Sequence, residues 1–208
     1  MKLYGVPMSN FYNMAKHALL EKGVKFEEVV CAPSQEADFL AKSPMGKIPV
    51  LETDEGFLTE APAIIEYLDI RYSENPLLPA EALARARTIQ LMRIMELYVE
   101  APIHPLVGLW FGREVSDQVK QSAKPEAEKG LAALARIAKF SPYMAGDAFS
   151  AADIVAYHSF TLASRLAMEV YDWDMMGVLP QLNGWYGMLG ERKSTLRILM
   201  DMAKATES

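Results

Sequence analysis

The chain has 208 residues, of which 21 are lysine or arginine and 27 are aspartate or glutamate, giving a formal net charge of -6. Nucleic-acid-binding proteins carry basic surfaces, so this balance argues against that class. The single cysteine, Cys31, excludes an internal disulfide and a Cys-x-x-Cys redox pair. The three histidines are too widely spaced for a zinc-ligand pattern, so no metal site is expected.

No apolar run approaches the roughly 18 to 20 residues that a membrane span needs. The apolar stretch after Lys2 is broken at Ser9 and Asn10, which is too early for the core of a signal peptide. We therefore expect a cytoplasmic protein with no membrane partner.

The first part of the chain alternates strand and helix patterns. A short strand pattern that includes Leu3 and Tyr4 comes first. Apolar residues at helical spacing follow it, and Gly23 ends that helix. The Asp54–Gly56 segment carries a hairpin signal. The predicted order is β-α-β-α-β-β-α, with strands at Lys2–Gly5, Lys25–Val30, Lys47–Thr53 and Phe57–Leu58, and helices over 11–22, 35–41 and 61–72.

Two prolines in the segment Asn75–Glu81 mark a linker, and the pattern beyond it is helical throughout. Pro102 and Pro105 each remove a backbone donor, which predicts a helix break near Ala101. Ser150 and Asp153 have the spacing of a capping box at the start of a long apolar helix.

Four stretches, VPMSNFYNMAKHALLEKG, SPMGKIPVLE, LTEAPAIIEYL and AGDAFSAADI, occur in this order and together resemble the glutathione transferases. The resemblance implies an α/β thioredoxin-like domain followed by an all-α domain. It assigns residues 1–74 to a glutathione-binding domain, 75–84 to a linker and 85–208 to the helical domain. The first stretch is most similar to the serine-type, phi-like pattern, and Cys31 lies too far along to match the cysteine type.

Ser9 stands where the first strand passes into the first helix, a place where free N–H groups and the helix dipole favour anions. A hydroxyl there can donate to a thiolate. From the residues alone, a helix N-cap is the stronger interpretation of Ser9. The resemblance makes it the catalytic residue that stabilises the glutathione thiolate, with Asn10, Tyr12 and Tyr4 as alternatives.

Ile48-Pro49 falls inside a strand-like run, where proline removes a ladder donor. The resemblance implies a cis peptide here, with the backbone of Ile48 pairing with glutathione. It also implies that Lys47 contacts the glycyl carboxylate and that Gln35 adds a further contact; a solvated lysine at a strand end is the alternative for Lys47.

Glu60-Ala61 departs from the family pattern, which usually has Glu-Ser at the start of this helix. The resemblance implies that the backbone N–H of Ala61 still meets the γ-glutamyl carboxylate while the hydroxyl contact is lost. Glu60 either lies near the glutathione amino group or is an ordinary first-turn acid.

The second substrate is expected between the two domains, facing Ser9. Thioether and aromatic groups suit variable apolar electrophiles, so the candidates for this pocket are Met8, Tyr12, Tyr98 and Trp110. For His104, which lies between two prolines, a structural contact is the more common role.

The sequence thus predicts a cytosolic, detoxifying glutathione transferase in which glutathione is a co-substrate and no cofactor is needed. The alternatives are a glutathione-dependent reductase or peroxidase on the same scaffold, and a carrier of apolar ligands without turnover. The resemblance also implies a homodimer.

Overall fold

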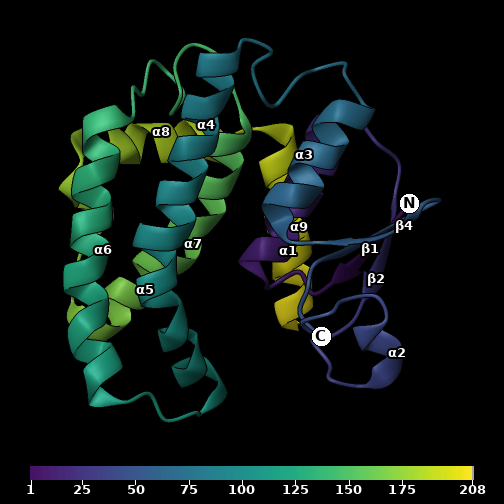
Figure 1. Cartoon of the computed structure of the whole chain (residues 1–208). Helices are drawn as coiled ribbons and strands as arrows, with labels where there is room; N and C mark the ends of the chain where they lie inside the picture. The colour runs from purple at the N-terminus through teal and green to yellow at the C-terminus, as the bar shows by residue number, and fades with distance from the viewer. Residues whose placement is uncertain (208) are drawn as a thin grey trace. The chain divides into compact units, whose positions relative to one another are not determined.

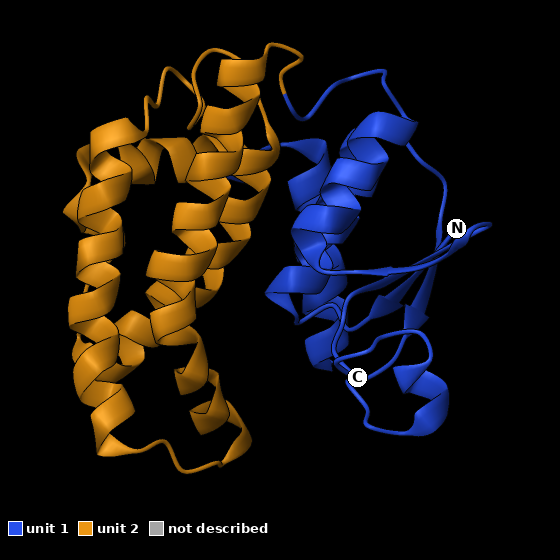
Figure 2. Ribbon diagram, in the orientation of Figure 1, with its two compact units in different colours: residues 1–78, 190–208 blue, residues 79–189 orange. Residues whose placement is uncertain are grey.

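The computed structural model describes residues 1–207, which form two compact units (Figure 2). Unit 1 consists of residues 1–78 together with the segment from residue 190 onward, and unit 2 of residues 79–189. The segment after residue 190, which the sequence had placed in the helical domain, therefore belongs to the unit that contains the sheet.

Unit 1 contains all the elements expected before the linker, in the predicted order (Figure 1). Its elements are β1 (Lys2–Gly5), α1 (Asn10–Glu21), β2 (Glu27–Val30), α2 (Ala37–Leu40), β3 (Val50–Thr53), β4 (Gly56–Thr59), α3 (Ala61–Arg71) and α9 (Lys193–Glu207). The strands form one mixed sheet of order β2-β1-β3-β4, in which only the β1–β2 pair is parallel.

The core of unit 1 lies between the sheet and α1, which also packs against α3 and α9. Leu3 on β1 and Leu51 on β3 are fully buried. Gly5 lies under the Tyr12 ring of α1, and a Cβ at this position would stand 2.4 Å from that ring. Only glycine allows α1 to pack this closely on β1.

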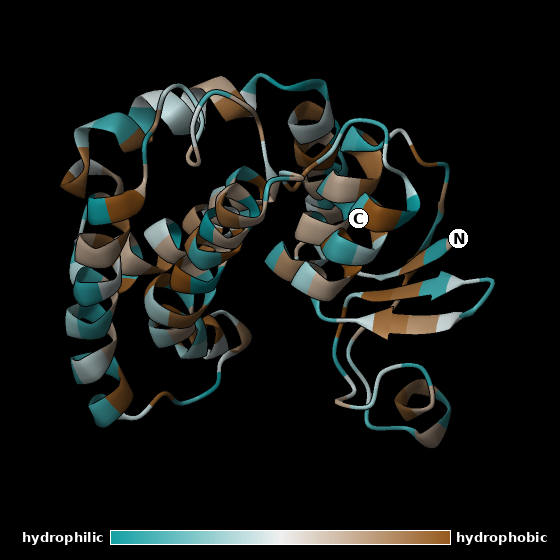
Figure 3. Cartoon of the chain, turned by 45° about the horizontal axis from the view of Figure 1, so that its top comes forward, coloured by the Kyte–Doolittle hydropathy of each residue, from teal (hydrophilic) through white to brown (hydrophobic). Residues whose placement is uncertain are grey.

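The named elements of unit 2 are all helices in the part of the chain that the structure describes. Its elements are α4 (Ala82–Ile94), the π-helix η1 (Met95–Glu100), α5 (Ala101–Ile103), the 3-10 helix η2 (His104–Phe111), α6 (Asp117–Ile137), α7 (Ala151–Tyr171), the 3-10 helix η3 (Met176–Val178) and α8 (Pro180–Gly190). Brown and teal bands alternate along the long helices in Figure 3, as expected for helices with one buried face.

The break expected near Ala101 is replaced by a change of helix type. The chain continues from α4 through the π-helical turn η1, one turn of α-helix and then η2. A π-turn shifts the hydrogen-bond ladder, so the donors missing at Pro102 and Pro105 do not end the helical path. Gly130 of α6 packs directly on this turn, since a Cβ there would stand 2.1 Å from the Tyr98 carbonyl oxygen.

The predicted capping box at the start of α7 is confirmed. Asp153 is fully buried, and its Oδ2 accepts from the backbone N–H of Ser150 at 2.9 Å. Its Oδ1 accepts from the Met144 N–H and the Trp185 indole N–H, both at 2.8 Å. One carboxylate thus connects the start of α7 to the preceding loop and to α8.

We expect Asp153→Ala to lower the free energy of unfolding by about 3 to 5 kcal/mol, because it leaves buried N–H donors without an acceptor. Urea unfolding followed by tryptophan fluorescence measures this. Asp174→Ala is the matched control: among residues 1–207, its exposed carboxylate accepts only from the Gly177 N–H, at 3.0 Å. Equal losses in the two variants would show that burial adds nothing at Asp153.

Glu21, the last residue of α1, joins this helix to the start of α9. Arg192 donates to it at 2.8 Å and Ser194 donates through its hydroxyl. Burial alone would raise the pKa of Glu21, but hydrogen bonds from His17, Arg192 and Ser194 lower it from 4.5 to about 2.

A carboxyl whose pKa is lowered on folding contributes stability above its unfolded pKa and loses that stability as the pH falls through its folded pKa. We therefore expect the stability difference between wild type and Glu21→Gln to be constant above pH 4.5 and to shrink by about 2 kcal/mol as the pH approaches 2, after allowance for solvent screening. Urea unfolding followed by far-ultraviolet circular dichroism between pH 7 and 2.5 measures it. If the unfolding free energies of wild type and Glu21→Gln changed in parallel with pH, the lowered pKa of Glu21 would be contradicted.

Candidate functional site

The register of the sheet brings three turns of unit 1 to one edge. Tyr4, near the end of β1, is opposite Val50 at the start of β3, and Val50 is opposite Thr59 at the end of β4. The turn after β1, the segment before β3 and the turn after β4 therefore emerge side by side. These turns carry Ser9, Ile48-Pro49 and Glu60-Ala61 respectively.

Ser9 is the N-cap of α1. Its backbone is extended, and its Oγ accepts from the Tyr12 N–H at 3.3 Å. Accepting this bond uses a lone pair and leaves the hydroxyl proton available to donate. The two roles considered for Ser9, helix cap and hydrogen-bond donor to an anion, are therefore compatible.

Asn13 holds the turn that contains Ser9, a role that the sequence analysis missed. It is 2% exposed, and its Nδ2 donates to the Pro7 carbonyl at 2.7 Å. Its backbone N–H donates to the Ser9 carbonyl at 3.0 Å. An amide four residues after a cap, on the inner face of the helix, is the pattern that identifies this contact.

Two of the three alternatives to Ser9, Tyr12 and Tyr4, have hydroxyls that already donate to carboxylates. The Tyr12 hydroxyl donates to Glu28 at 2.6 Å, and the Tyr4 hydroxyl donates to Glu52. The bond to Glu52 raises the pKa of Tyr4 to about 12, and burial, followed by the bond to Glu28, raises that of Tyr12. Both phenols therefore stay neutral, with their protons directed at carboxylates. Burial raises the pKa of the Cys31 thiol as well.

The Ile48-Pro49 peptide is cis, as predicted. Its position is fixed by Ser43, whose hydroxyl donates to the Lys47 carbonyl at 2.7 Å and accepts from the Lys47 N–H at 3.0 Å. The side chain of Lys47 is exposed. The chain thus presents a lysine immediately before the cis peptide.

Gln35 lies against the loop that leads to Lys47. Its Nε2 donates to the Met45 carbonyl at 3.3 Å, and the Ser34 N–H donates to the Gly46 carbonyl at 3.1 Å. Gly46 has φ +64, and a Cβ there would stand 2.3 Å from the Ser34 carbonyl oxygen. The two loops meet only because this residue is glycine.

Glu60 and Ala61 form the turn from β4 into α3. Glu60 has φ 65 and ψ 110, a conformation that non-glycine residues rarely adopt and that often marks a ligand site. Its side chain is exposed and caps nothing. Ala61 is 2% exposed and begins the helix, whose first-turn N–H groups favour an anion.

The residues expected to line a second-substrate pocket lie in different surroundings. Met8, directly before Ser9, is 46% exposed, whereas Tyr12 is buried in the core of unit 1. In unit 2, Tyr98 is exposed on η1, and the Trp110 indole donates to Glu169 at 2.6 Å. His104 is held by Glu100, with 3.2 Å between Nδ1 and Oε1.

Among residues 1–207, no cluster of three or more histidine, cysteine or acidic side chains is arranged to hold a metal ion. No helix in the same range is long and apolar enough to cross a bilayer.

The combination of a mixed four-stranded sheet, a cis-proline before β3 and a helical second unit defines a thioredoxin-like transferase architecture. The glutathione S-transferase N-terminal domain model matches residues 3–76, and the C-terminal domain model matches residues 114–187. A glutathione S-transferase of Pseudomonas putida is 38% identical, covering 97% of this chain and 92% of its own length. Glutathione S-transferase 1 of Dianthus caryophyllus is 31% identical, covering 99% and 96%.

Solved structures agree with this. The bacterial transferase BphK, solved as a ternary complex, superposes with a TM-score of 0.81 at 28% identity, covering 98% of this chain and all of that one. A sphingomonad glutathione S-transferase in complex with glutathione gives 0.79 at 29% identity, covering 98% and 99%. This chain belongs to the glutathione S-transferase family.

Proposed function

We propose that this protein activates the thiol of glutathione through Ser9 and transfers its sulfur to a small apolar electrophile. The observation that carries the proposal is the sheet register, which brings the three turns with Ser9, Pro49 and Ala61 to one edge of unit 1. Glutathione is a co-substrate in this scheme, with no resident cofactor.

The same edge offers a group for each part of the tripeptide. The α3 N-terminus at Ala61 suits the γ-glutamyl carboxylate, with the exposed Glu60 near the amino group. The backbone of Ile48 pairs with the central residue. Lys47 and Gln35 lie on the adjoining loops, where they suit the glycyl carboxylate.

Ser9 acts on the sulfur. A thiol with a pKa near 8.5 is only a few per cent ionised at neutral pH, and each unit of lowering corresponds to about 1.4 kcal/mol. A hydrogen bond from the Ser9 hydroxyl, together with the N-terminus of α1, stabilises the thiolate. The thiolate then forms a sulfur–carbon bond with the electrophile as the leaving group departs with the bonding pair.

Met8, exposed beside Ser9, offers a polarisable surface suited to small apolar electrophiles. A cytoplasmic location and a homodimer belong to the same proposal; gel filtration tests the dimer.

Assays with glutathione and either an aromatic halide or a hydroperoxide distinguish the possible activities. Turnover of the halide supports transfer, turnover of the hydroperoxide alone indicates a peroxidase, and binding without turnover indicates a carrier.

We expect Ser9→Ala to raise the pKa of bound glutathione and reduce kcat about 10²-fold, with little change in glutathione affinity. Thiolate absorbance titration and steady-state kinetics measure the two effects. Ser116→Ala is the matched control, because the Ser116 hydroxyl caps α6 through the Val119 N–H at the same 3.3 Å. Both variants should lose about 1 kcal/mol of stability. An unchanged thiol pKa in Ser9→Ala would leave this residue only the role of a cap.

We expect Ala61→Ser to tighten glutathione binding by about 1 kcal/mol, or several-fold, because it restores a donor beside an anion site. Turnover at saturating glutathione should change little, since the γ-glutamyl end is bound alike in ground and transition states. The unliganded variant should be slightly less stable, because the new hydroxyl is buried at this position. Calorimetric titration of wild type and Ala61→Ser with glutathione measures this difference. Equal or weaker binding by the variant would indicate that the site binds another ligand and would favour the alternative of a carrier without turnover.

A further inference from the structure

The chain reaches Ser9 through a tight turn that begins at Val6. The Ser9 N–H donates to the Val6 carbonyl at 3.0 Å, so Pro7 and Met8 are the two central residues of a β-turn. The common turn types differ in the orientation of the peptide between the central residues. That orientation decides whether the turn presents a carbonyl or an N–H beside Ser9.

Asn13 fixes the orientation of the Pro7–Met8 peptide. Its side chain is 2% exposed, and its Nδ2 donates to the Pro7 carbonyl at 2.7 Å. The peptide is trans and planar, so the Met8 N–H points in the direction opposite to that carbonyl. Because the carbonyl is held against a buried amide, the N–H faces away from the core, on the side where Met8 is exposed.

The Met8 N–H is not used by the fold. Within residues 1–207 it has no hydrogen-bond acceptor. It precedes the Ser9 side chain by one residue, so a backbone donor and a hydroxyl stand next to each other at the start of α1. A ligand atom that reaches the hydroxyl therefore meets a second donor whose direction is already fixed.

The Asn13 amide is an unfavourable choice for the core alone. Its Oδ1 is buried and has no partner among the residues that the structure describes. Burying a polar atom without a partner costs stability, and a leucine of similar shape would avoid that cost. What the amide adds is the bond to the Pro7 carbonyl, which acts on the turn.

We propose that the Met8 N–H is a second donor to the glutathione thiolate, beside the Ser9 hydroxyl, and that Asn13 is the positioning residue that directs it. Backbone N–H groups with a fixed direction stabilise developing negative charge in the same way in oxyanion holes. The inference rests on the proposed function, because it requires the sulfur of glutathione to lie next to Ser9.

The direct test replaces the Pro7–Met8 amide of the full-length protein by an ester, using the α-hydroxy analogue of methionine at position 8. The ester keeps the side chain and removes an N–H that has no bond within the described fold to lose. We expect the pKa of bound glutathione, titrated by thiolate absorbance, to rise by about 1. Turnover below the wild-type pKa should then fall about tenfold. Glutathione affinity at that pH should change little, because the protonated thiol is the form that binds.

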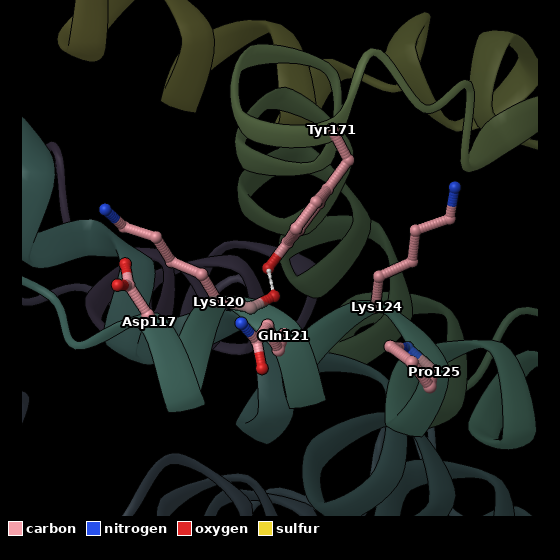
Figure 4. A pocket seen from close by; sticks show the side chains of 6 residues that line it. All are labelled: Asp117, Lys120, Gln121, Lys124, Pro125 and Tyr171. Carbon is pink, nitrogen blue, oxygen red and sulfur yellow. Dashed lines mark hydrogen bonds between the residues drawn. The ribbon is translucent and has the colours of Figure 1, made fainter.

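Asn13→Leu tests the positioning role, since it removes the amide and keeps a branched side chain. The peptide can then turn over, so we expect a similar rise in the bound-thiol pKa. The ester combined with Asn13→Leu should show no further rise, because the donor is already absent. Tyr171→Phe is the matched control: it removes a side-chain bond to the Lys120 carbonyl of the same 2.7 Å in unit 2 (Figure 4). Its bound-thiol pKa should equal that of wild type.

Ser9→Ala, titrated alongside, separates this inference from the proposed function. If Ser9→Ala raises the bound-thiol pKa and the ester leaves it unchanged, the inference is overturned and the proposed function stands. If the thiol of glutathione bound to wild type keeps the pKa of free glutathione, both are overturned. An unchanged pKa in Asn13→Leu, or additive effects of Asn13→Leu and the ester, overturns the role of Asn13.

Discussion

The structure of unit 1 depends on the burial of polar side chains on α1. This helix is buried on nearly all sides, yet several of its buried side chains are polar. They are Asn13, Lys16 and His17, together with the adjoining Lys22. A buried polar group without a partner costs as much as a lost core contact. Each element around α1 therefore has to supply a partner, and the positions of those partners determine how the unit assembles.

The partners come from every side of the helix. Lys16 bonds to Asp201 of α9 at 2.7 Å and also pairs with Glu28 of β2. Lys22 bonds to Asp69 of α3 at 2.6 Å, and the same Asp69 oxygen accepts from the Leu77 N–H at the start of the connection to unit 2. Asn13 holds the turn with Ser9. The position of the candidate catalytic hydroxyl is therefore set by the same requirement that orders the core.

Features determined by nearby residues could be predicted from the sequence. The elements of unit 1 that precede the linker and the Ser150–Asp153 box depend on spacing over a few residues, and the cis peptide at Ile48-Pro49 followed from the motif around it. The sequence also predicted that Ser9 caps α1, because that bond spans only three residues.

Features determined by distant contacts could not be predicted. The bond between Lys16 and Asp201 joins positions 185 residues apart, and no local pattern placed α9 with the sheet. The break expected near Pro102 was wrong because a π-turn, against which Gly130 packs closely, takes its place. The hydrogen bonds from the Tyr4 and Tyr12 hydroxyls to carboxylates also could not be predicted without coordinates. These bonds distinguish the two tyrosines from Ser9 as candidate donors to the thiolate.

The discontinuity of unit 1 has a consequence during synthesis on the ribosome. The first 78 residues leave the exit tunnel well before Arg192, Ser194 and Asp201 exist, because all of unit 2 is translated in between. During that time α1 exposes Lys16 and Glu21 without their partners from the end of the chain. Domains commonly fold in order from the N-terminus. Here the continuous unit 2 can complete its own core first, and the sheet-containing unit, although it begins the chain, is the one that must wait.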